Sequence, residues 1–443
     1  MSARTILLYL SGHAGAIHDA AQSRAAFVTG LVLVLLTTIP RNYDQTFIGD
    51  DVLRWVFASL LFSLVSGTWL YGVAYGWLAR WRMGVEDRTE AEFFAGWRCF
   101  MGLFWLTAPI AWLYALPVER FLDSVSATQV NVALLGVVSL WRVLLMGRVL
   151  QVLCGAPFYA ALMWVLLAAG VEVFVVGIFS PAFSKSIMSA MGGMRNSPEE
   201  EILLVALNTA MGAALYGTPL ALLAVFLIRP KGVRGLPVQQ PARVPVSLLV
   251  GLAVAWGAVA CGPQMEVART AKARRLVESG KYREAVDYLA GQQPGDFAPA
   301  VPLPPKTFER ATFEQLPGVI GVLQPTDPAW VRQVMFKKLD EMVAHSGHKH
   351  GAPRDQHDRV KFIEWVEHGS WVYSAKPEGF VTMLDGLVRL PEGQEWLRRN
   401  ELYLQGLKAA AMAERRAQEP GWKLLAGRVE TALGGLPTSP PKP

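Results

Sequence analysis

Long apolar segments, each near the length of a membrane-spanning helix, dominate the first 262 residues of the chain. A helix needs about 20 mainly apolar residues to cross a lipid bilayer. Six segments approach or meet this requirement at 25–39, 52–79, 99–118, 130–152, 156–179 and 202–228, and a seventh lies at 246–262. The pattern predicts an all-α fold, with a polytopic transmembrane helical bundle of about seven spans followed by a mostly helical soluble domain.

Three further segments flank or separate these spans. Residues 1–24 hold an apolar run too short for a span, which predicts a cytoplasmic or interfacial segment with an amphipathic helix at the membrane surface. Residues 229–245 carry four basic residues, four prolines and no acidic residue, and are predicted to be a flexible cytoplasmic linker after the six-span bundle at 25–228. The proline-rich tail at 434–443 is predicted to be disordered.

Residues 263–433 have the mixed apolar and polar pattern of a soluble helical domain. The stretch "AKARRLVESGKYREAVDYLAG" places Leu276, Tyr282, Ala285 and Leu289 at helical spacing around a glycine, as in a tetratricopeptide-type helical hairpin. No second copy of this pattern follows, so a single hairpin packed on the rest of the domain is expected. Further helical patterns occur at 330–343, 360–367 and 392–416.

Basic residues between the spans predict the orientation of the bundle, because cytoplasmic loops of membrane proteins are enriched in lysine and arginine. Eleven such residues fall on one side and five on the other: Arg4, Arg24, Arg80, Arg82, Arg88, Arg98, Arg148, Arg229, Lys231, Arg234 and Arg243 against Arg41, Arg54, Arg120, Lys185 and Arg195. This distribution predicts a cytoplasmic N-terminus, and seven crossings then place the C-terminal domain outside the cytoplasm. Four basic residues after the last span oppose this bias and reduce it to eleven against nine: Arg269, Lys272, Arg274 and Arg275.

Overall composition adds few constraints. The net charge of +6 and the pI of about 9.2 do not require a nucleic-acid partner, because the basic residues follow the loops of a membrane protein. The three cysteines lie in or beside apolar segments, which excludes a disulfide framework in the C-terminal domain. The sequence has no phosphate-binding glycine motif, zinc-protease motif or nucleophile elbow, so no cofactor is expected.

Three charged residues fall inside predicted spans: Arg142 and Arg148 in 130–152 and Glu172 in 156–179. A charge in the hydrocarbon region costs about 3 kcal/mol on insertion scales, and therefore faces the bundle interior and pairs there. Arg142 and Glu172 lie at comparable depths in consecutive antiparallel spans, which predicts a structural ion pair. Arg148 lies nearer the turn and is expected to reach interfacial water. The alternative is an ion or proton pathway past Glu172, with Asn131 and Asn208 as further polar groups.

Five of the seven histidines lie between His345 and His368. Imidazole is a common zinc or copper ligand, so His345, His348, His350 and His357 are weak candidate metal ligands. Two glycines and a proline interrupt the segment, and Lys349 adds a positive charge among the imidazoles. A solvated polar loop without a specific metal is therefore the expected structure.

Several stretches resemble a group of bacterial multi-pass integral membrane proteins that are uncharacterised and have a helical C-terminal extracytoplasmic domain. They are "SRAAFVTGLVLVLLTTIPRNYDQ", "FWLTAPIAWLYALPVERFL", "VVSLWRVLLMGRVL" and "EAVDYLAGQQPGDFAPAVPLPP". The resemblance covers about half of the chain in patches. It implies a two-part architecture in a bacterial inner membrane, with the C-terminal domain in the periplasm, and it assigns no activity to any residue.

Three functional classes are compatible with this pattern. A non-enzymatic membrane scaffold or interaction protein is favoured, with the lipid bilayer and an unknown protein bound by the C-terminal domain as its partners. A transporter or channel component is the alternative, with Glu172, Arg142 and Asn208 as polar groups in the bundle. A membrane enzyme would require titratable residues that converge in one cleft.

Overall fold

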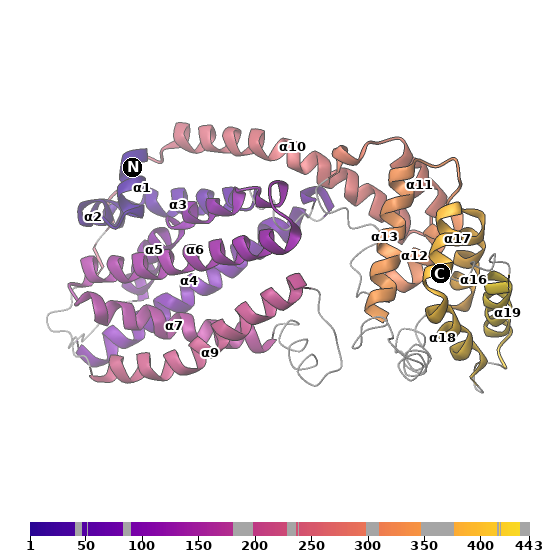
Figure 1. Ribbon diagram of the computed structural model, residues 1–443. Coiled ribbons are helices and arrows are strands. Elements are labelled where there is room, and N and C mark those ends of the chain that lie inside the picture. The colour runs from indigo at the N-terminus through magenta and orange to yellow at the C-terminus, as the bar shows by residue number, and fades with distance from the viewer. Residues whose placement is uncertain are drawn as a thin grey trace. The chain divides into compact units, whose positions relative to one another are not determined.

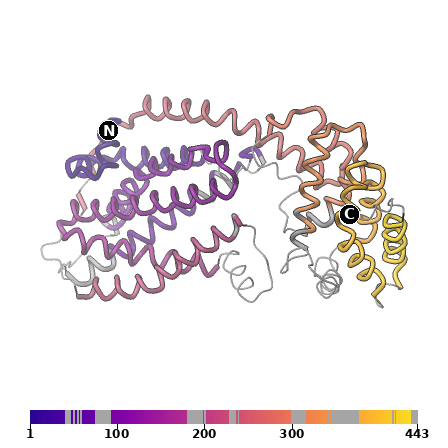
Figure 2. The backbone as a smooth tube through the Cα atoms, in the orientation of Figure 1, coloured from indigo at the N-terminus to yellow at the C-terminus, as the bar shows by residue number. Residues whose placement is uncertain are grey.

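Helices form both parts of the chain in the computed structural model (Figure 1, Figure 2). The structure describes residues 1–39, 47–50, 52–82, 90–179, 198–227, 236–237, 239–297, 310–346, 376–413, 416 and 418–434. Within these ranges there is no β-strand, so the all-α prediction is confirmed for them. The chain divides into two compact units, Met1–Gln264 (unit 1) and Met265–Pro443 (unit 2).

Unit 1 contains the long apolar helices. Its elements are α1 (Ala3–Leu10), α2 (Ala14–Gln22), α3 (Ala25–Leu36), η2 (Ile48–Asp50), α4 (Val52–Arg82), α5 (Glu90–Trp105), η3 (Ala108–Ala115), η4 (Val118–Arg120), α6 (Ser124–Cys154), α7 (Phe158–Phe179), α9 (Pro198–Leu227) and the first part of α10 (Val246–Glu278). α10 crosses the unit boundary as one helix and continues through Pro263.

Five segments in the described part of the chain are long and apolar enough to cross a membrane. They are Phe93–Arg120, Ser124–Cys154, Phe158–Phe179, Glu201–Leu227 and Val246–Glu278. Two of the seven predicted spans are shorter as apolar helices, Ala25–Leu36 and Leu60–Ala74. The Phe93–Arg120 segment changes from α-helix to 3₁₀-helix at η3, where Pro109 supplies no amide hydrogen for the α-helical ladder.

Phe93–Arg120 (the central segment) is the most buried of these five segments, and it packs against α3, α4 and α6. In its most apolar stretch 61% of the residues are buried, against 22% in both α6 and α7, 17% in α9 and 11% in α10. The other long helices expose large apolar side chains, including Phe57, Leu140, Phe174 and Val254. An outer surface of this kind suits hydrocarbon better than water, because exposed apolar patches of this extent are rare on soluble proteins.

The N-terminal helices α1 and α2 form a hairpin that packs into unit 1. Tyr9 and Ile17 are fully buried, and the Tyr9 hydroxyl donates a hydrogen bond of 2.7 Å to the Leu103 carbonyl oxygen of α5. On the opposite face Leu7 is 68% exposed. The sequence predicted an amphipathic helix at the membrane surface in 1–24, but one face of α1 is buried inside unit 1. Ile6 and Tyr9, three residues apart, form that buried face.

The helices α3 and α5 approach one another closely at two glycines. A Cβ atom at Gly30 would lie 2.9 Å from the Gly102 carbonyl oxygen and 2.8 Å from the Trp105 Cβ. A Cβ atom at Gly102 would lie 2.9 Å from the Phe27 amide nitrogen. These distances are below any ordinary carbon contact, so larger side chains would push the two helices apart. Small residues at helix interfaces permit such close packing in membrane bundles.

Unit 2 is built from the end of α10 and seven further α-helices in the described ranges. They are α11 (Tyr282–Ala290), α12 (Arg310–Val322), α13 (Ala329–Ser346), α16 (Pro377–Arg389), α17 (Pro391–Arg399), α18 (Glu401–Met412) and α19 (Pro420–Gly434), with a short η5 (Pro294–Asp296). The predicted helical hairpin is confirmed, since α10 turns into α11 at Gly280, whose φ is +76°. The predicted helix at 392–416 is two helices that meet at Asn400, and 360–367 lies outside the described residues.

The apolar side chains of unit 2 point inward. Trp396, Phe380 and Tyr403 are almost completely buried in one core. Four large apolar residues of its described part are exposed: Met265, Val388, Met412 and Leu424. Unit 2 therefore encloses most of the large apolar side chains of its described part, in contrast to unit 1.

We predict that Gly102→Ala destabilises unit 1 by about 1–3 kcal/mol, because the added methyl group overpacks the crossing of α3 and α5. Gly136→Ala in α6 is the matched control, since a Cβ atom there meets no atom within 4 Å. Alanine in a helix interior should leave the control equal to or slightly above the parent protein in stability. Thermal unfolding of the purified full-length protein in detergent measures both, and equal midpoints for the two variants would contradict the close approach.

Candidate functional site

The side chain of Arg142 contacts residues at the junction between α5 and η3. Its Nε donates a hydrogen bond of 3.1 Å to the Thr107 hydroxyl, and its guanidinium carbon lies 5.1 Å from the centre of the Phe104 ring. Thr107 is fully buried and donates in turn to the Phe104 carbonyl oxygen at 2.7 Å. The charge is therefore solvated by a hydroxyl and an aromatic face, both of which come from the central segment.

Glu172 contacts α4, whereas Arg142 contacts the Phe93–Arg120 segment. Its carboxylate accepts a hydrogen bond from the Ser66 hydroxyl of α4, and one turn earlier on α7 the Ala168 carbonyl oxygen accepts 3.0 Å from Trp69 Nε1. Among the described residues no direct ion pair joins Arg142 to Glu172. Thr107 and Ser66 supply the direct hydrogen bonds of the two charged groups, which act on one another at longer range. The structural ion pair therefore stays a prediction.

Arg148 and Trp141 connect α6 to the N-terminal hairpin. Trp141 Nε1 donates 3.1 Å to the Leu10 carbonyl oxygen, and Arg148 Nε donates 3.2 Å to the Gly12 carbonyl oxygen. The two residues lie seven positions apart and so share one face of α6. Arg148, predicted to reach interfacial water, is half-buried and donates to the Gly12 carbonyl oxygen in the turn between α1 and α2 and to the Gln151 side chain.

The two asparagines lie on different helices. Asn131 Nδ2, on α6, donates 2.6 Å to the Glu119 carboxylate, and Asn208 lies on α9. Arg142, Glu172 and Asn208 thus belong to α6, α7 and α9, which pack on one another. The polar residues that a transport pathway would use therefore come from adjacent helices. Arg142 and Glu172 each have a hydrogen-bond partner on another element.

The described end of the basic linker docks on the N-terminal hairpin. The Gln240 amide donates 2.6 Å to the Gln22 carbonyl oxygen, and the Arg24 amide donates 3.0 Å to the Gln240 carbonyl oxygen. Arg98 Nε donates 3.3 Å to the Gln239 side chain. The prediction that 229–245 is flexible is therefore wrong for 239–243, because main-chain pairing with α2 and α3 fixes this part; 229–235 and 238 lie outside the described residues.

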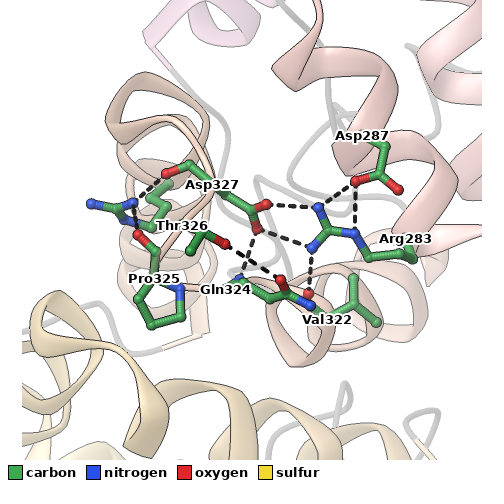
Figure 3. A network of polar contacts seen from close by, with 8 residues as sticks. Arg283, Asp287, Val322, Gln324, Pro325, Thr326 and Asp327 are labelled. Atoms are coloured by element: carbon green, nitrogen blue, oxygen red, sulfur yellow. Dashed lines mark hydrogen bonds and ion pairs between the residues drawn. The ribbon is translucent and has the colours of Figure 1, made fainter.

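A second polar network lies in unit 2, around Arg283 of α11 (Figure 3). The guanidinium binds both carboxylate oxygens of Asp327, at 2.6 and 3.1 Å, and its Nε donates 2.9 Å to Asp287. Asp327 is also bound by the Gln324 amide at 2.7 Å. The arginine therefore ties α11 to the turn between α12 and α13. Sequence reasoning missed this network, because Arg283 and Asp327 are far apart in the chain.

The network continues from that turn to α17. Arg332 donates 2.9 Å to the Pro325 carbonyl oxygen and forms an ion pair of 2.8 Å with Glu392. Hydrogen bonds to Asp327 raise the pKa of Arg283, and the hydrogen bond from Arg283 lowers the pKa of Asp287. The backbone amide of Glu392 and then Arg332 lower the pKa of Glu392. These groups keep fixed charges near neutral pH, which suits a structural role rather than proton transfer.

The candidate metal ligands lie mostly outside the described residues. His345 falls in the last turn of α13, where its side chain is not described, and His348, His350 and His357 follow in 347–375. In the part of the chain that the structure describes, no group of three or more histidine, cysteine or acidic residues could hold a metal ion. The histidine loop therefore stays a prediction.

Comparisons of the sequence and structure with known proteins identify no related protein. No protein-family model matches the chain, and searches of curated proteins and of solved structures find no match.

The separate contacts of Arg142 and Glu172 predict additive effects of mutation. Arg142→Leu and Glu172→Leu should each lower the stability of the detergent-solubilised protein, by about 1–3 kcal/mol, the usual cost of losing a hydrogen bond to a charged group. The double variant should lose the sum of the two to within about 0.5 kcal/mol. A double-mutant cycle by thermal unfolding tests this, and substantial recovery in the double variant would instead support the ion pair predicted from the sequence.

The Arg283 network predicts a graded response in unit 2. Asp327→Asn should cost about 2–3 kcal/mol, because Asp327 is 5% exposed and holds two arginine hydrogen bonds. Asp287→Asn is the matched control and should cost less, since Asp287 is 59% exposed on the same arginine. Hydrogen exchange of the α11 and α13 amides in the full-length protein measures both variants.

The same network predicts a pH dependence. The pKa values of Asp287 and Glu392 are lowered in the folded protein, so their contribution to stability is present above the unfolded pKa. It is lost as the pH falls through the folded value. The protection of the α11 amides, corrected for the intrinsic slowing of exchange at low pH, should therefore fall on acidification in the parent protein. An equal fall in the Asp287→Asn variant would exclude Asp287 as a source.

Proposed function

We propose that this chain is a multi-pass membrane scaffold protein, without enzymatic activity, that holds a helical interaction domain at a membrane surface. The observation that supports it is the contrast between the two units: large apolar side chains cover the outer helices of unit 1, and they are enclosed in unit 2. α10 contains both an apolar stretch and the first helical residues of unit 2, so it joins the anchor to the domain.

Seven crossings remain the proposed topology. The five long apolar segments supply five of them, and α3 and α4 supply the other two. Snorkelling of the flanking Arg24 can extend the short span of α3. The proposed location is a bacterial inner membrane with the N-terminus in the cytoplasm and unit 2 in the periplasm. One observation supports this orientation. Arg24 and Arg98, both assigned to the cytoplasmic side, contact the segment 239–243, which includes Arg243 of the same side. Membership of the bacterial multi-pass group is likewise a proposal.

The proposed partner of unit 2 is a protein of the cell envelope. A rigid helical unit with a polar surface and a few exposed apolar side chains fits a transient protein contact better than burial in lipid. The anchor would keep that contact near the membrane and raise the effective concentration of the partner there.

A transporter or channel component is the second candidate. The hydrogen bond between Ser66 and Glu172 favours it, because an ionisable group in apolar helices marks an ion or proton pathway in many membrane proteins. Under this alternative, Glu172 would exchange a proton or bind a cation, while Arg142 and Asn208 would line the path.

Photo-crosslinking in native membranes separates the two candidates. A photoreactive residue at Leu424, which is 55% exposed in unit 2, should capture one defined protein, and the matched position Val254, 67% exposed on α10, should capture lipid. The scaffold proposal fails if Leu424 captures no protein while proteoliposomes of the purified chain carry a proton flux that Glu172→Gln abolishes.

A further inference from the structure

Four arginines gather around residues 239–243 at one end of unit 1. The Arg98 guanidinium contacts Gln239, the Arg24 amide contacts Gln240, and the Arg243 carbonyl oxygen accepts 3.3 Å from the nitrogen of Met1, just before α1. An extended chain covers at most about 3.6 Å per residue, so these anchor points lie within about 14 Å. Arg4 follows on the first turn of α1.

The side chains of these arginines are available to a ligand. Arg4, Arg24, Arg98 and Arg243 are exposed, and none of them takes part in an ion pair within the described part of the chain. Charges on one small surface add to its electrostatic potential, which acts over a Debye length of about 8 Å at physiological ionic strength. A single anionic group placed between two or three of them would be attracted by all.

Exposed apolar side chains accompany these charges. Leu7 is 68% exposed one turn after Arg4 on α1, and Phe94 is 62% exposed one turn before Arg98 on α5. Basic and apolar side chains that alternate in this way are typical of helices at the boundary between lipid headgroups and acyl chains. A nucleic acid or an acidic peptide would satisfy the charges alone, whereas a phospholipid satisfies both kinds of side chain.

We propose that this surface, formed by Arg4, Arg24, Arg98 and Arg243, selects anionic phospholipid headgroups over zwitterionic ones. The inference rests on the proposed membrane location of unit 1 and adds a lipid specificity to it. The guanidinium groups bind the phosphate and the acidic headgroup oxygens, and Leu7 and Phe94 contact the acyl chains below. The linker is docked here by main-chain bonds of Gln240 to Gln22 and Arg24, which hold Arg243 within three residues of the Arg24 contact.

Native mass spectrometry of the full-length protein in detergent tests the proposal, with dioleoylphosphatidylglycerol and dioleoylphosphatidylcholine as the two probes. The variant replaces Arg4, Arg24 and Arg243 together by Gln. Arg98 is kept because its side chain contacts Gln239. Arg24 and Arg243 make the contacts of this region through backbone atoms, so the docked arrangement should survive the change. The apparent Kd for phosphatidylglycerol should rise at least about fivefold, the factor expected for loss of even one basic residue from an anionic surface.

The matched control removes the same three charges from unit 2, through Lys337→Gln, Arg398→Gln and Lys423→Gln, all at exposed positions. It should leave the Kd for phosphatidylglycerol unchanged. Replacement of Arg4, Arg24 and Arg243 by Lys should retain the preference for the anionic lipid, because the charge is kept. If the triple Gln variant fails to fold, Arg243→Gln alone supplies the measurement and should weaken binding in the same direction.

The outcomes separate this inference from the proposed function. Equal affinity of the parent protein for the two lipids overturns the lipid specificity and leaves the membrane anchor standing. An unchanged Kd in the triple Gln variant, or an equal rise in the control, also overturns it. A parent protein that stays dispersed in water without detergent would instead overturn the proposed membrane location.

Discussion

Main-chain carbonyl oxygens are the acceptors on which the packing of unit 1 depends. In hydrocarbon no water can satisfy a polar group, so a donor on an apolar helix is stabilised by an acceptor within the protein. Tyr9 donates to Leu103, Cys99 donates to Ala21, and Trp69 donates to Ala168, in each case to a carbonyl oxygen of another helix. Such bonds fix the register between two helices although only one of them contributes a polar side chain. The partner helix can therefore stay entirely apolar in sequence.

Arg142 and Arg148 extend the same principle to charged donors. Arg148 binds the Gly12 carbonyl oxygen in the turn between α1 and α2, and Arg142 binds the Thr107 hydroxyl, which itself donates to a carbonyl oxygen. In unit 2 both kinds of acceptor occur, since Arg283 binds the Asp327 carboxylate and Arg389 donates to the Gly321 carbonyl oxygen. A guanidinium with five donors can serve either environment, and the surroundings decide whether its acceptor is a neutral oxygen or a carboxylate.

The sequence was sufficient for features with a periodic apolar pattern. The predicted spans at 130–152 and 156–179 correspond to α6 and α7 within a few residues, because burial in an apolar environment leaves a local signal. Arg142 and Glu172 lie on α6 and α7, as the span predictions imply, but the sequence did not indicate their hydrogen-bond partners. Thr107 and Ser66 lie on other elements, and a hydrogen bond between distant residues leaves no local pattern.

Main-chain pairing was the least predictable feature, since it is independent of side-chain identity. Residues 239–243 have the composition of a flexible linker, yet Gln240 bonds through its backbone to Gln22 and Arg24. Proline-rich composition excludes a helix or a central strand, but it does not exclude a single extended segment that lies against a folded edge.

The pairing of Arg24 with Gln240 also has a consequence for the order of events during synthesis. The two residues are separated by most of unit 1, and at about 5–20 residues per second a ribosome needs roughly 10–40 s to reach the second after making the first. Throughout that interval the junction between α2 and α3 lacks its final partner, while α4 to α9 are produced. The N-terminal hairpin is thus among the first parts of the chain to emerge and among the last to complete its contacts.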